Sequence, residues 1–221
     1  MPLTLLSIGR TPAAADLAGI AVAHTAATVA EVDAALAQLD GSRLVIDAAE
    51  LAGLNLVLTR LLRAGRLAEV ETAVLLDRPV RYLAGLGLPA DRAGQLALAH
   101  TGSSRLVGIV RDDSGGVCVS EARLTAWQPA EPWWARAVVD DLPLCDGLVR
   151  SVTMRRIGPS ELIAEARIGR FRVRRQRGRA LQLACDPAQI VADGMGRERP
   201  RRKRTFWSEP AQWRLALPPA R

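Results

Sequence analysis

The fold of this chain is decided by one stretch, RLVIDAAELAGLNLVLTRLLRAG, which runs from Arg43 to Gly65. Residues 43–47, with Leu44-Val45-Ile46 at their centre, predict a short buried β-strand, and residues 54–62 have the apolar spacing of a helix. The connection between them, residues 48–53, lies where α/β folds commonly bind a phosphate. Such a site needs glycines, because backbone N–H groups must approach the anion at the start of a helix. The connection contains one glycine and also Glu50, which would repel a phosphate.

The composition is that of an ordinary globular protein with an excess of positive charge. The chain has 221 residues, of which 49% are apolar and 24% charged, and its net charge is +7. This length is enough for one large core or two small ones. Lys203 is the only lysine, so arginine carries the charge. That usage is typical of GC-rich bacterial genomes as well as of arginine-based recognition, and the sequence leaves both explanations open.

The cysteine and histidine content argues against a zinc site of ordinary ligand spacing. Cys118, Cys145 and Cys185 form no CxxC pair, and His24 and His100 are the only histidines. An odd number of cysteines disfavours a disulfide framework and favours a reducing compartment. The N-terminus lacks the basic segment of a signal peptide, and no apolar run approaches the roughly 20 residues of a membrane span. We therefore predict a cytoplasmic protein, soluble or peripherally attached to a membrane, without a bound metal.

The first hundred residues alternate short apolar strands with helices. Thr28 and Glu31 have the spacing of a capping box, in which each side chain accepts a hydrogen bond from the backbone of the other residue. Near-continuous apolar strands separated by helices imply a mostly parallel sheet covered on both faces. The predicted strands span residues 3–8, 20–24, 43–47 and 70–76, and the predicted helices span residues 13–18, 28–39, 54–62 and 90–100.

After Ser103 the pattern changes to short β-rich runs separated by turn residues. Asp112 to Gly116 reads as a hairpin turn, and Asp140-Asp141 and Asp146-Gly147 read as turns as well. This spacing predicts an antiparallel sandwich or barrel, and of the two we take the sandwich. We therefore expect an N-terminal three-layer α/β domain over residues 1–102 and a C-terminal antiparallel β-sandwich domain over residues 103–221.

This order of an α/β half and an all-β half, with the strand and helix of residues 44–62, resembles the diacylglycerol kinase-like catalytic fold. That fold is the lipid-kinase branch of the superfamily that includes NAD kinases. In the family, a strand leads into Gly-Gly-Asp-Gly-Thr, then an apolar residue and Asn, then a helix. Leu54-Asn55 resembles the apolar residue and Asn, and the five signature positions fall on residues 49–53, where none matches.

Two further family elements are also altered. A Pro-Gly-Thr-Gly-Asn-type segment is expected near Asp77 to Leu88 and is absent, while Asp193-Gly194-Met195 keeps part of a late Asp-Gly-Glu turn. The resemblance thus implies Asp47, Gly53 and Asn55 as remnants of a cofactor site. Asp47, at the carboxyl end of a strand, is equally well explained as a residue that leads into a helix.

The second half carries two arginine-rich stretches, residues 170–177 and 197–204. In the first, Arg alternates with Phe171 and Val173, so a strand there would have a basic face and an apolar face. The second is followed by Phe206 and Trp207, a pairing of cations with interfacial aromatics that suits an anionic membrane surface. Alternatives for this second stretch are a solvated hairpin and single-stranded nucleic acid. The predicted surface-binding residues are Arg201, Arg202, Lys203, Arg204 and Trp207.

These observations favour a non-catalytic or catalytically altered relative of the lipid kinases. Such a protein would bind a lipid, a nucleotide fragment or a protein partner, including a second copy of itself, and would need no cofactor. One alternative is an active lipid kinase with an atypical phosphate loop, which would require ATP and Mg²⁺. Another is a basic nucleic-acid-binding module, although no nucleic-acid-binding motif is present.

Overall fold

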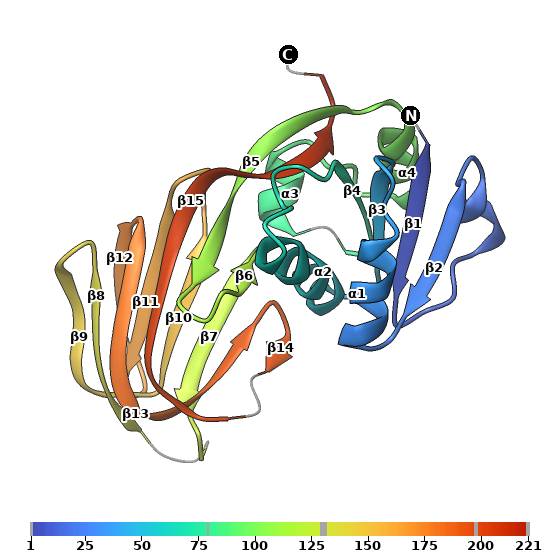
Figure 1. Cartoon of the computed structure of the whole chain (residues 1–221). Helices are drawn as coiled ribbons and strands as arrows, with labels where there is room; N and C mark the ends of the chain where they lie inside the picture. The colour runs from blue at the N-terminus through green and yellow to red at the C-terminus, as the bar shows by residue number, and fades with distance from the viewer. Residues whose placement is uncertain (1, 79, 129–131, 197–198, 220–221) are drawn as a thin grey trace. The chain divides into compact units, whose positions relative to one another are not determined.

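The computed structural model describes residues 2–78, 80–128, 132–196 and 199–219 (Figure 1). The chain forms two compact units: unit 1 comprises residues 1–107 and 211–221, and unit 2 comprises residues 108–210. The predicted division at residue 102 assigned the whole C-terminal part to one domain. In the structure the end of the last strand, β15 (Arg201–Leu217), returns to unit 1, because it pairs with a strand of the first sheet.

Unit 1 is built on a parallel sheet in the order β4-β3-β1-β2, with the end of β15 beside β4. Registered pairs such as Leu5 with Val45 and Val45 with Ala73 show that the strands run side by side without a shift. β1, β3 and β4 are buried along almost their whole length, as the sequence predicted for a sheet covered on both faces, whereas β2 at the edge is mostly exposed. These strands are β1 (Leu3–Ile8), β2 (Val22–Ala26), β3 (Arg43–Ala48) and β4 (Thr72–Leu76).

Helices cover both faces of this sheet, so unit 1 has the predicted three layers. Ala99 of α4 packs with Leu3, Leu5 and Val45 on one face. On the other face, Gly53 of α2 lies against Ile8 and Ala48, which alternate with those residues along their strands. The helical elements are η1 (Ala14–Leu17), α1 (Val29–Ala37), α2 (Leu51–Arg63), α3 (Arg81–Gly85) and α4 (Arg92–Thr101).

The capping box at the start of α1 is confirmed. The Glu31 amide donates to Thr28 Oγ1 at 3.3 Å, and the Thr28 amide donates to Glu31 Oε2 at 2.9 Å. Both backbone hydrogens would otherwise lack a partner at the helix start. Among the described residues, no helix is both long and apolar enough to cross a bilayer.

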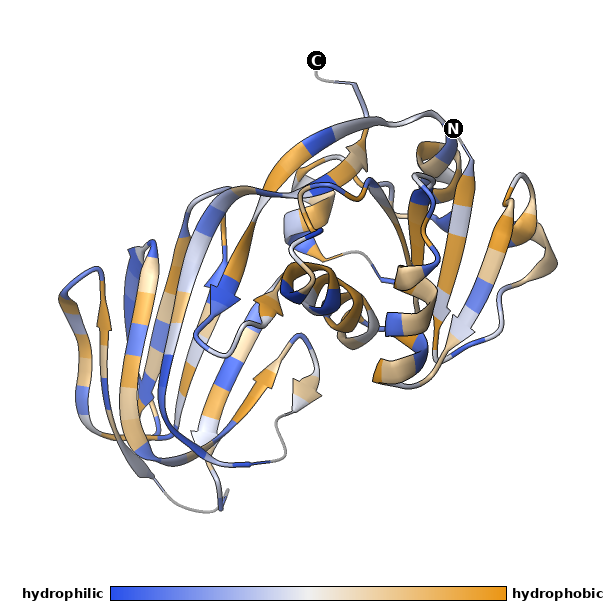
Figure 2. Cartoon of the chain, viewed as in Figure 1, coloured by the Kyte–Doolittle hydropathy of each residue, from blue (hydrophilic) through white to orange (hydrophobic). Residues whose placement is uncertain are grey.

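Unit 2 is a predominantly antiparallel β-sandwich, and within the described residues after Thr101 no helix is found. Apolar and polar residues alternate along several of its strands (Figure 2), as expected where one face of a sheet is buried. Its strands are the second part of β5 (Ser103–Asp112), from residue 108 on, and β6 (Val117–Cys118), β7 (Glu121–Ala126), β8 (Trp133–Val139), β9 (Leu142–Val149), β10 (Ser151–Arg156), β11 (Leu162–Ile168), β12 (Arg172–Gly178), β13 (Ala180–Ala192), β14 (Met195–Gly196) and the first part of β15.

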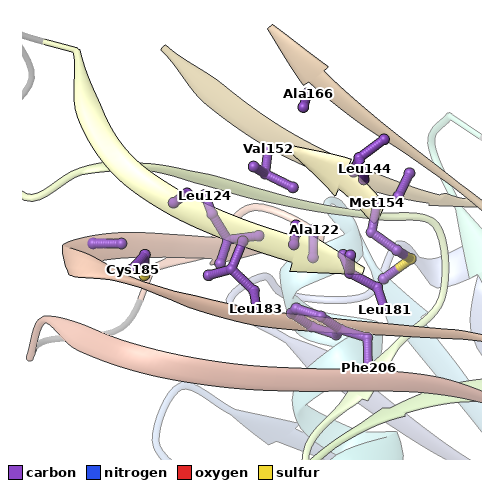
Figure 3. Close-up of a cluster of buried hydrophobic side chains, with 14 of the residues drawn as sticks. Ala122, Leu124, Leu144, Val152, Met154, Ala166, Leu181, Leu183, Cys185 and Phe206 are labelled. Carbon is purple, nitrogen blue, oxygen red and sulfur yellow. The ribbon is translucent and has the colours of Figure 1, made fainter. Parts of the chain in front are cut away.

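The two layers of the sandwich are joined by β13, which takes part in both. Its first half, Leu181 to Cys185, pairs with β8 and β15, and its second half, Ala188 to Ala192, pairs with β7. The register shifts between Ala184 and Ala188, around Pro187, which has no N–H to donate to a neighbouring strand. The core lies between the layers and is centred on Leu124, Met154, Leu181, Leu183 and Phe206 (Figure 3).

Candidate functional site

Only two residues separate the end of β3 from the start of helix α2, so the connection is shorter than the one over residues 48–53 that the sequence predicted. Residues 51–53, predicted to lie in the connection, are the first turn of the helix. Ala49 and Glu50 alone join the two elements, and both are exposed. Glu50 occupies the N-cap position but makes no side-chain capping hydrogen bond. Two residues cannot wrap around a phosphate, and the negative charge at the helix start opposes one.

Gly53 serves close packing rather than contact with an anion. It is helical, and a Cβ placed on it would lie 3.1 Å from Ala48 Cβ and 3.1 Å from Ile8 Cβ. Those atoms belong to β3 and β1, so the missing side chain allows α2 to approach the sheet. The glycine is therefore needed for helix–sheet contact, and its backbone is not presented to a ligand.

Asn55 is also part of the packed interior. Its side chain is buried, and Thr59 Oγ1 donates to Asn55 Oδ1 at 3.3 Å within α2. Asp47, by contrast, lies on the sheet face that α4 covers, since it is in register with Ser7 and alternates with Ile46 and Ala48. The structure therefore does not bring Asp47 and Asn55 together into one site.

Asp47 is the centre of an ion-pair cluster at the carboxyl edge of the unit 1 sheet. Its carboxylate is fully buried and accepts from Ser7 Oγ at 3.0 Å. It also pairs with Arg10, which follows β1, and with Arg92 Nη2 at 2.9 Å, which is the first residue of α4. Each oxygen of Asp47 is thus already held by groups of the chain itself.

Two more carboxylates extend the cluster. Arg10 Nη1 donates to Asp77 at 2.7 Å, and Arg92 holds Asp16 in a fork, Nε to Oδ1 at 2.9 Å and Nη2 to Oδ2 at 2.8 Å. We call Arg10, Asp16, Asp47, Asp77 and Arg92 the carboxyl-edge cluster. It combines two guanidinium groups with three carboxylates, so its net charge does not favour an anionic ligand.

The pKa shifts in this cluster follow from these contacts. The hydrogen bond from Arg92, opposed by burial, lowers the pKa of Asp16 from its ordinary value. The hydrogen bond to Asp16, with a further one to Asp47, raises the pKa of Arg92. For Arg10, burial acts to lower the pKa, but hydrogen bonds to Asp47 and Asp77 outweigh it and the pKa rises. Each of these three shifts favours the charged form of Arg10, Asp16 or Arg92.

Asp193, the predicted remnant of the late turn, has a structural role. Its buried carboxylate accepts from the amides of Val119, Ser120 and Glu121, the last two at 2.9 and 3.0 Å. Asp193 and Gly194 both have positive φ, at 50° and 84°, in the turn between β13 and β14. Asp193 thus fixes the bend between β6 and β7, and its oxygens face the backbone of that bend.

The predicted surface-binding residues lie in β15, and one of them, Arg204, is buried and so cannot contact a surface. Arg201, Arg202 and Lys203 are exposed. Arg204 is only 3% exposed and pairs with Asp113 at 2.6 Å, because strand alternation turns it inward. Trp207 is half-buried, with Arg111 Cζ 5.7 Å from its ring centroid. Residues 197 and 198 of the predicted segment lie outside the described part of the chain.

A hollow of about 340 Å³ lies on the strand surface of unit 2. It is lined by two sets of residues that are paired side by side on β8, β13 and β15. One set is Arg136, Ala184 and Lys203, and the other is Val138, Gln182 and Thr205. Arg136 reaches Asp146 only at 3.9 Å, and both of these side chains are mostly exposed. Lys203 forms no ion pair within the described residues. The hollow therefore has an excess of positive charge beside an amide and a hydroxyl.

Comparison with solved structures identifies the fold. A diacylglycerol kinase from Bacillus anthracis str. Sterne superimposes with a TM-score of 0.69 at 8% identity, over 99% of this chain and 97% of that one. An NAD kinase from Archaeoglobus fulgidus, solved in complex with ATP, gives 0.60 at 9% identity, over 98% and 94%. The chain has the diacylglycerol kinase/NAD kinase-like fold. No sequence-family model and no curated protein sequence matches it.

The family resemblance predicted from residues 44–62 is thus confirmed at the level of the fold. The carboxyl-edge cluster of this kinase-like fold could have been found only in part from the sequence. Asp47 ends a predicted strand, Asp77 follows another by one residue, and Arg10 follows a third by two. The carboxyl ends of parallel strands meet at one edge, which is a signal for the three residues. Asp16 and Arg92 carry no comparable signal.

Proposed function

We propose that this chain is a non-catalytic relative of the diacylglycerol and lipid kinases that binds an anionic ligand without transferring phosphate from ATP. The observation that supports this proposal is the carboxyl edge of unit 1. There, only Ala49 and Glu50 connect β3 to α2, where a phosphate loop would be needed. Both carboxylate oxygens of Asp47 are already bound, by Ser7, Arg10 and Arg92.

ATP and Mg²⁺, which the fold implies, do not fit the residues present. Phosphoryl transfer depends on positioning and electrostatic stabilisation, by a backbone cradle, cations and carboxylates that hold the metal. Gly53 cannot contribute to a cradle, because the backbone at that position is packed against Ile8 and Ala48. Asp47 cannot hold a metal without giving up its contacts with two arginines, and the positive charges of Arg10 and Arg92 beside it would repel the metal ion.

The hollow on unit 2 supports an anionic ligand. Lys203 and Arg136 supply positive charge there, and Gln182 and Thr205 supply groups that can hydrogen-bond phosphate oxygens. Arg204 lines the same hollow, but its charge is already balanced by Asp113. A phosphate group fits this chemistry, whether it belongs to a lipid head group or to a small soluble phosphoester.

The direct test of lost catalysis is calorimetry with ATP and Mg²⁺, together with a radiolabel-transfer assay on a lipid extract. We expect no binding heat and no labelled lipid. Micromolar ATP binding that weakens in Asp47→Asn, combined with transfer of label, would instead establish the active-kinase alternative.

The ligand site is tested by titrating inorganic phosphate and glycerol phosphate into the protein and into Lys203→Gln. Loss of one charged hydrogen-bond donor should weaken binding by roughly tenfold. Arg123→Gln is the matched control, because Arg123 is an exposed arginine on β7 that does not line the hollow. If Lys203→Gln and Arg123→Gln bind these phosphates with equal affinity, the hollow is not the binding site. A response to lipid vesicles but not to soluble phosphoesters would identify the ligand as a head group.

A further inference from the structure

The hairpin formed by β11 and β12 ends in an exposed aromatic side chain. The two strands pair in register from Leu162 with Gly178 to Ile168 with Arg172, and residues 169–171 make the turn. Gly169 has φ +61°, which a tight turn of this kind requires. Phe171 at the tip is 87% exposed, the highest value among the exposed large apolar side chains of the described chain.

The same hairpin carries a dense positive charge without acidic residues near the tip. Six arginines lie between residues 167 and 177, a range with no Asp or Glu: Arg167, Arg170, Arg172, Arg174, Arg175 and Arg177. In the described part of the chain, only Arg175 of these six forms an ion pair, with Glu165 at 2.8 Å. The Arg170 guanidinium lies 5.3 Å from the Phe171 ring centroid, so a cation and an aromatic share the tip.

Strand β12 is an edge strand, and packing inside the unit does not account for its composition. Among the described strands it pairs with β11 alone, and residues 172–175 are all exposed. Charged residues on an edge strand prevent unwanted pairing with other chains, which explains arginines there. That explanation does not extend to Phe171, whose exposed ring increases the tendency to associate.

We propose that the β11–β12 hairpin docks on an anionic lipid surface, with Phe171 entering the interfacial layer and the flanking arginines contacting lipid phosphates. A protruding apolar tip surrounded by cations matches a membrane interface, which offers an apolar layer below an anionic one. Single-stranded nucleic acids are instead bound in basic grooves with stacking platforms. The hairpin exposes its aromatic at the end of a ribbon. The inference does not depend on whether ATP is bound, nor on the hollow that Lys203 lines.

The first experiment is sedimentation with vesicles of phosphatidylcholine containing phosphatidylglycerol. Phe171→Ala should weaken binding by about three- to tenfold, because part of the ring's apolar area leaves water on docking. Replacing Arg170, Arg172 and Arg174 with Gln should weaken it by roughly tenfold or more and remove most of its salt dependence.

A matched control is available on the neighbouring hairpin of β8 and β9. Its turn contains Asp140 and Asp141, and the next residue, Leu142, is 53% exposed. Leu142→Ala removes an exposed apolar side chain from an acidic hairpin and should leave vesicle binding unchanged. If Phe171→Ala and Leu142→Ala change the affinity for vesicles by the same amount, the proposal is wrong.

A second readout reports insertion directly. The native cysteines are buried, so the variant Phe171→Cys can be labelled selectively at position 171 with an environment-sensitive dye. The emission of this label should shift to the blue with anionic vesicles, and the same label on Leu142→Cys should not respond. An unchanged spectrum at position 171 would reject docking through the tip. Oligonucleotides that displace the protein from vesicles and quench the label at low salt would show that the partner is a nucleic acid instead.

Discussion

Asp16 and Arg92 illustrate, at the scale of single residues, how the carboxyl-edge cluster stabilises unit 1. The hydrogen bond from Arg92 lowers the pKa of Asp16 in the folded protein. Asp16 therefore contributes stability that is present above its unfolded pKa of about 3.9 and is lost as the pH falls through the lower folded value. We expect Asp16→Asn to reduce the free energy of unfolding by about 1–3 kcal/mol near neutral pH. Denaturant unfolding as a function of pH measures this, and the difference from the native protein should shrink below about pH 4.

A matched control for that measurement is Asp33, which pairs with Arg60 at 2.6 Å but has a more exposed carboxylate, at 41%. Asp33→Asn should cost less, about 1 kcal/mol or below. A penalty for Asp16→Asn that stays constant down to the acid transition would mean that the side chain acts through packing and not through its charge.

Single residues were also where prediction from sequence was least complete. Asp47 could be selected because it ends a strand, but its partner Arg92 lies 45 positions later, on an element whose place beside the sheet is set by tertiary packing. Arg204 was predicted to be exposed because its stretch is basic. Its burial depends on which way the strand alternates, and the pairing of β15 with β13 decides that.

Helix α2 gives the prediction at the scale of elements. A glycine inside a helix is normally unfavourable, so replacing it by alanine gains up to about 1 kcal/mol. At Gly53 the added Cβ would meet Ala48 and Ile8 at 3.1 Å, on two strands of the sheet. We expect Gly53→Ala to give no gain and Gly53→Val to cost about 1–3 kcal/mol through overpacking. Thermal unfolding of both variants is the measurement.

Gly85 of α3 is the control for this effect, because nothing lies within 4 Å of a Cβ placed there. Gly85→Ala should be neutral or stabilising by up to about 1 kcal/mol. Stabilisation of the same size by Gly53→Ala would show that α2 can move away from the sheet, and would reopen the question of a phosphate loop at its start.

Most elements were predictable because each carries a local signal. The strands of unit 1 are apolar runs, and α1 begins at a capping box whose residues are adjacent in sequence. The start of α2 was predicted three residues late, because Leu51 and Ala52 were assigned by family position and not by their own helix propensity. β9 was not predicted as one strand, because Pro143, Asp146 and Gly147 are typical of turns; the prediction of a turn at Asp146-Gly147 was wrong, since both residues lie within β9.

At the scale of the whole molecule, the order of an α/β half and a β half was visible in the change of periodicity after Ser103. The membership of the C-terminal residues in unit 1 was not visible in the sequence. A strand that passes from one unit into another has the same local sequence pattern as a strand that stays within one unit. Residues 213–217 read simply as the end of a β-rich region. Their membership in unit 1 depends on the pairing of Leu215 with Thr72, which are far apart in sequence.

The last prediction concerns that discontinuous unit. Trp213 is fully buried and donates from Nε1 to Thr72 Oγ1 at 2.7 Å, and Leu215, Ala216 and Leu217 are also buried. A fragment of residues 1–107 lacks all four side chains. Loss of a buried Trp alone costs about 3–5 kcal/mol, a large part of the roughly 5–15 kcal/mol by which a domain is stable. We therefore expect this fragment to unfold without a cooperative thermal transition.

Joining residues 211–221 to it through a flexible linker should restore the transition, and Trp213→Ala in the joined fragment should abolish it again. A cooperative transition in residues 1–107 alone would show that the first unit folds without the end of β15.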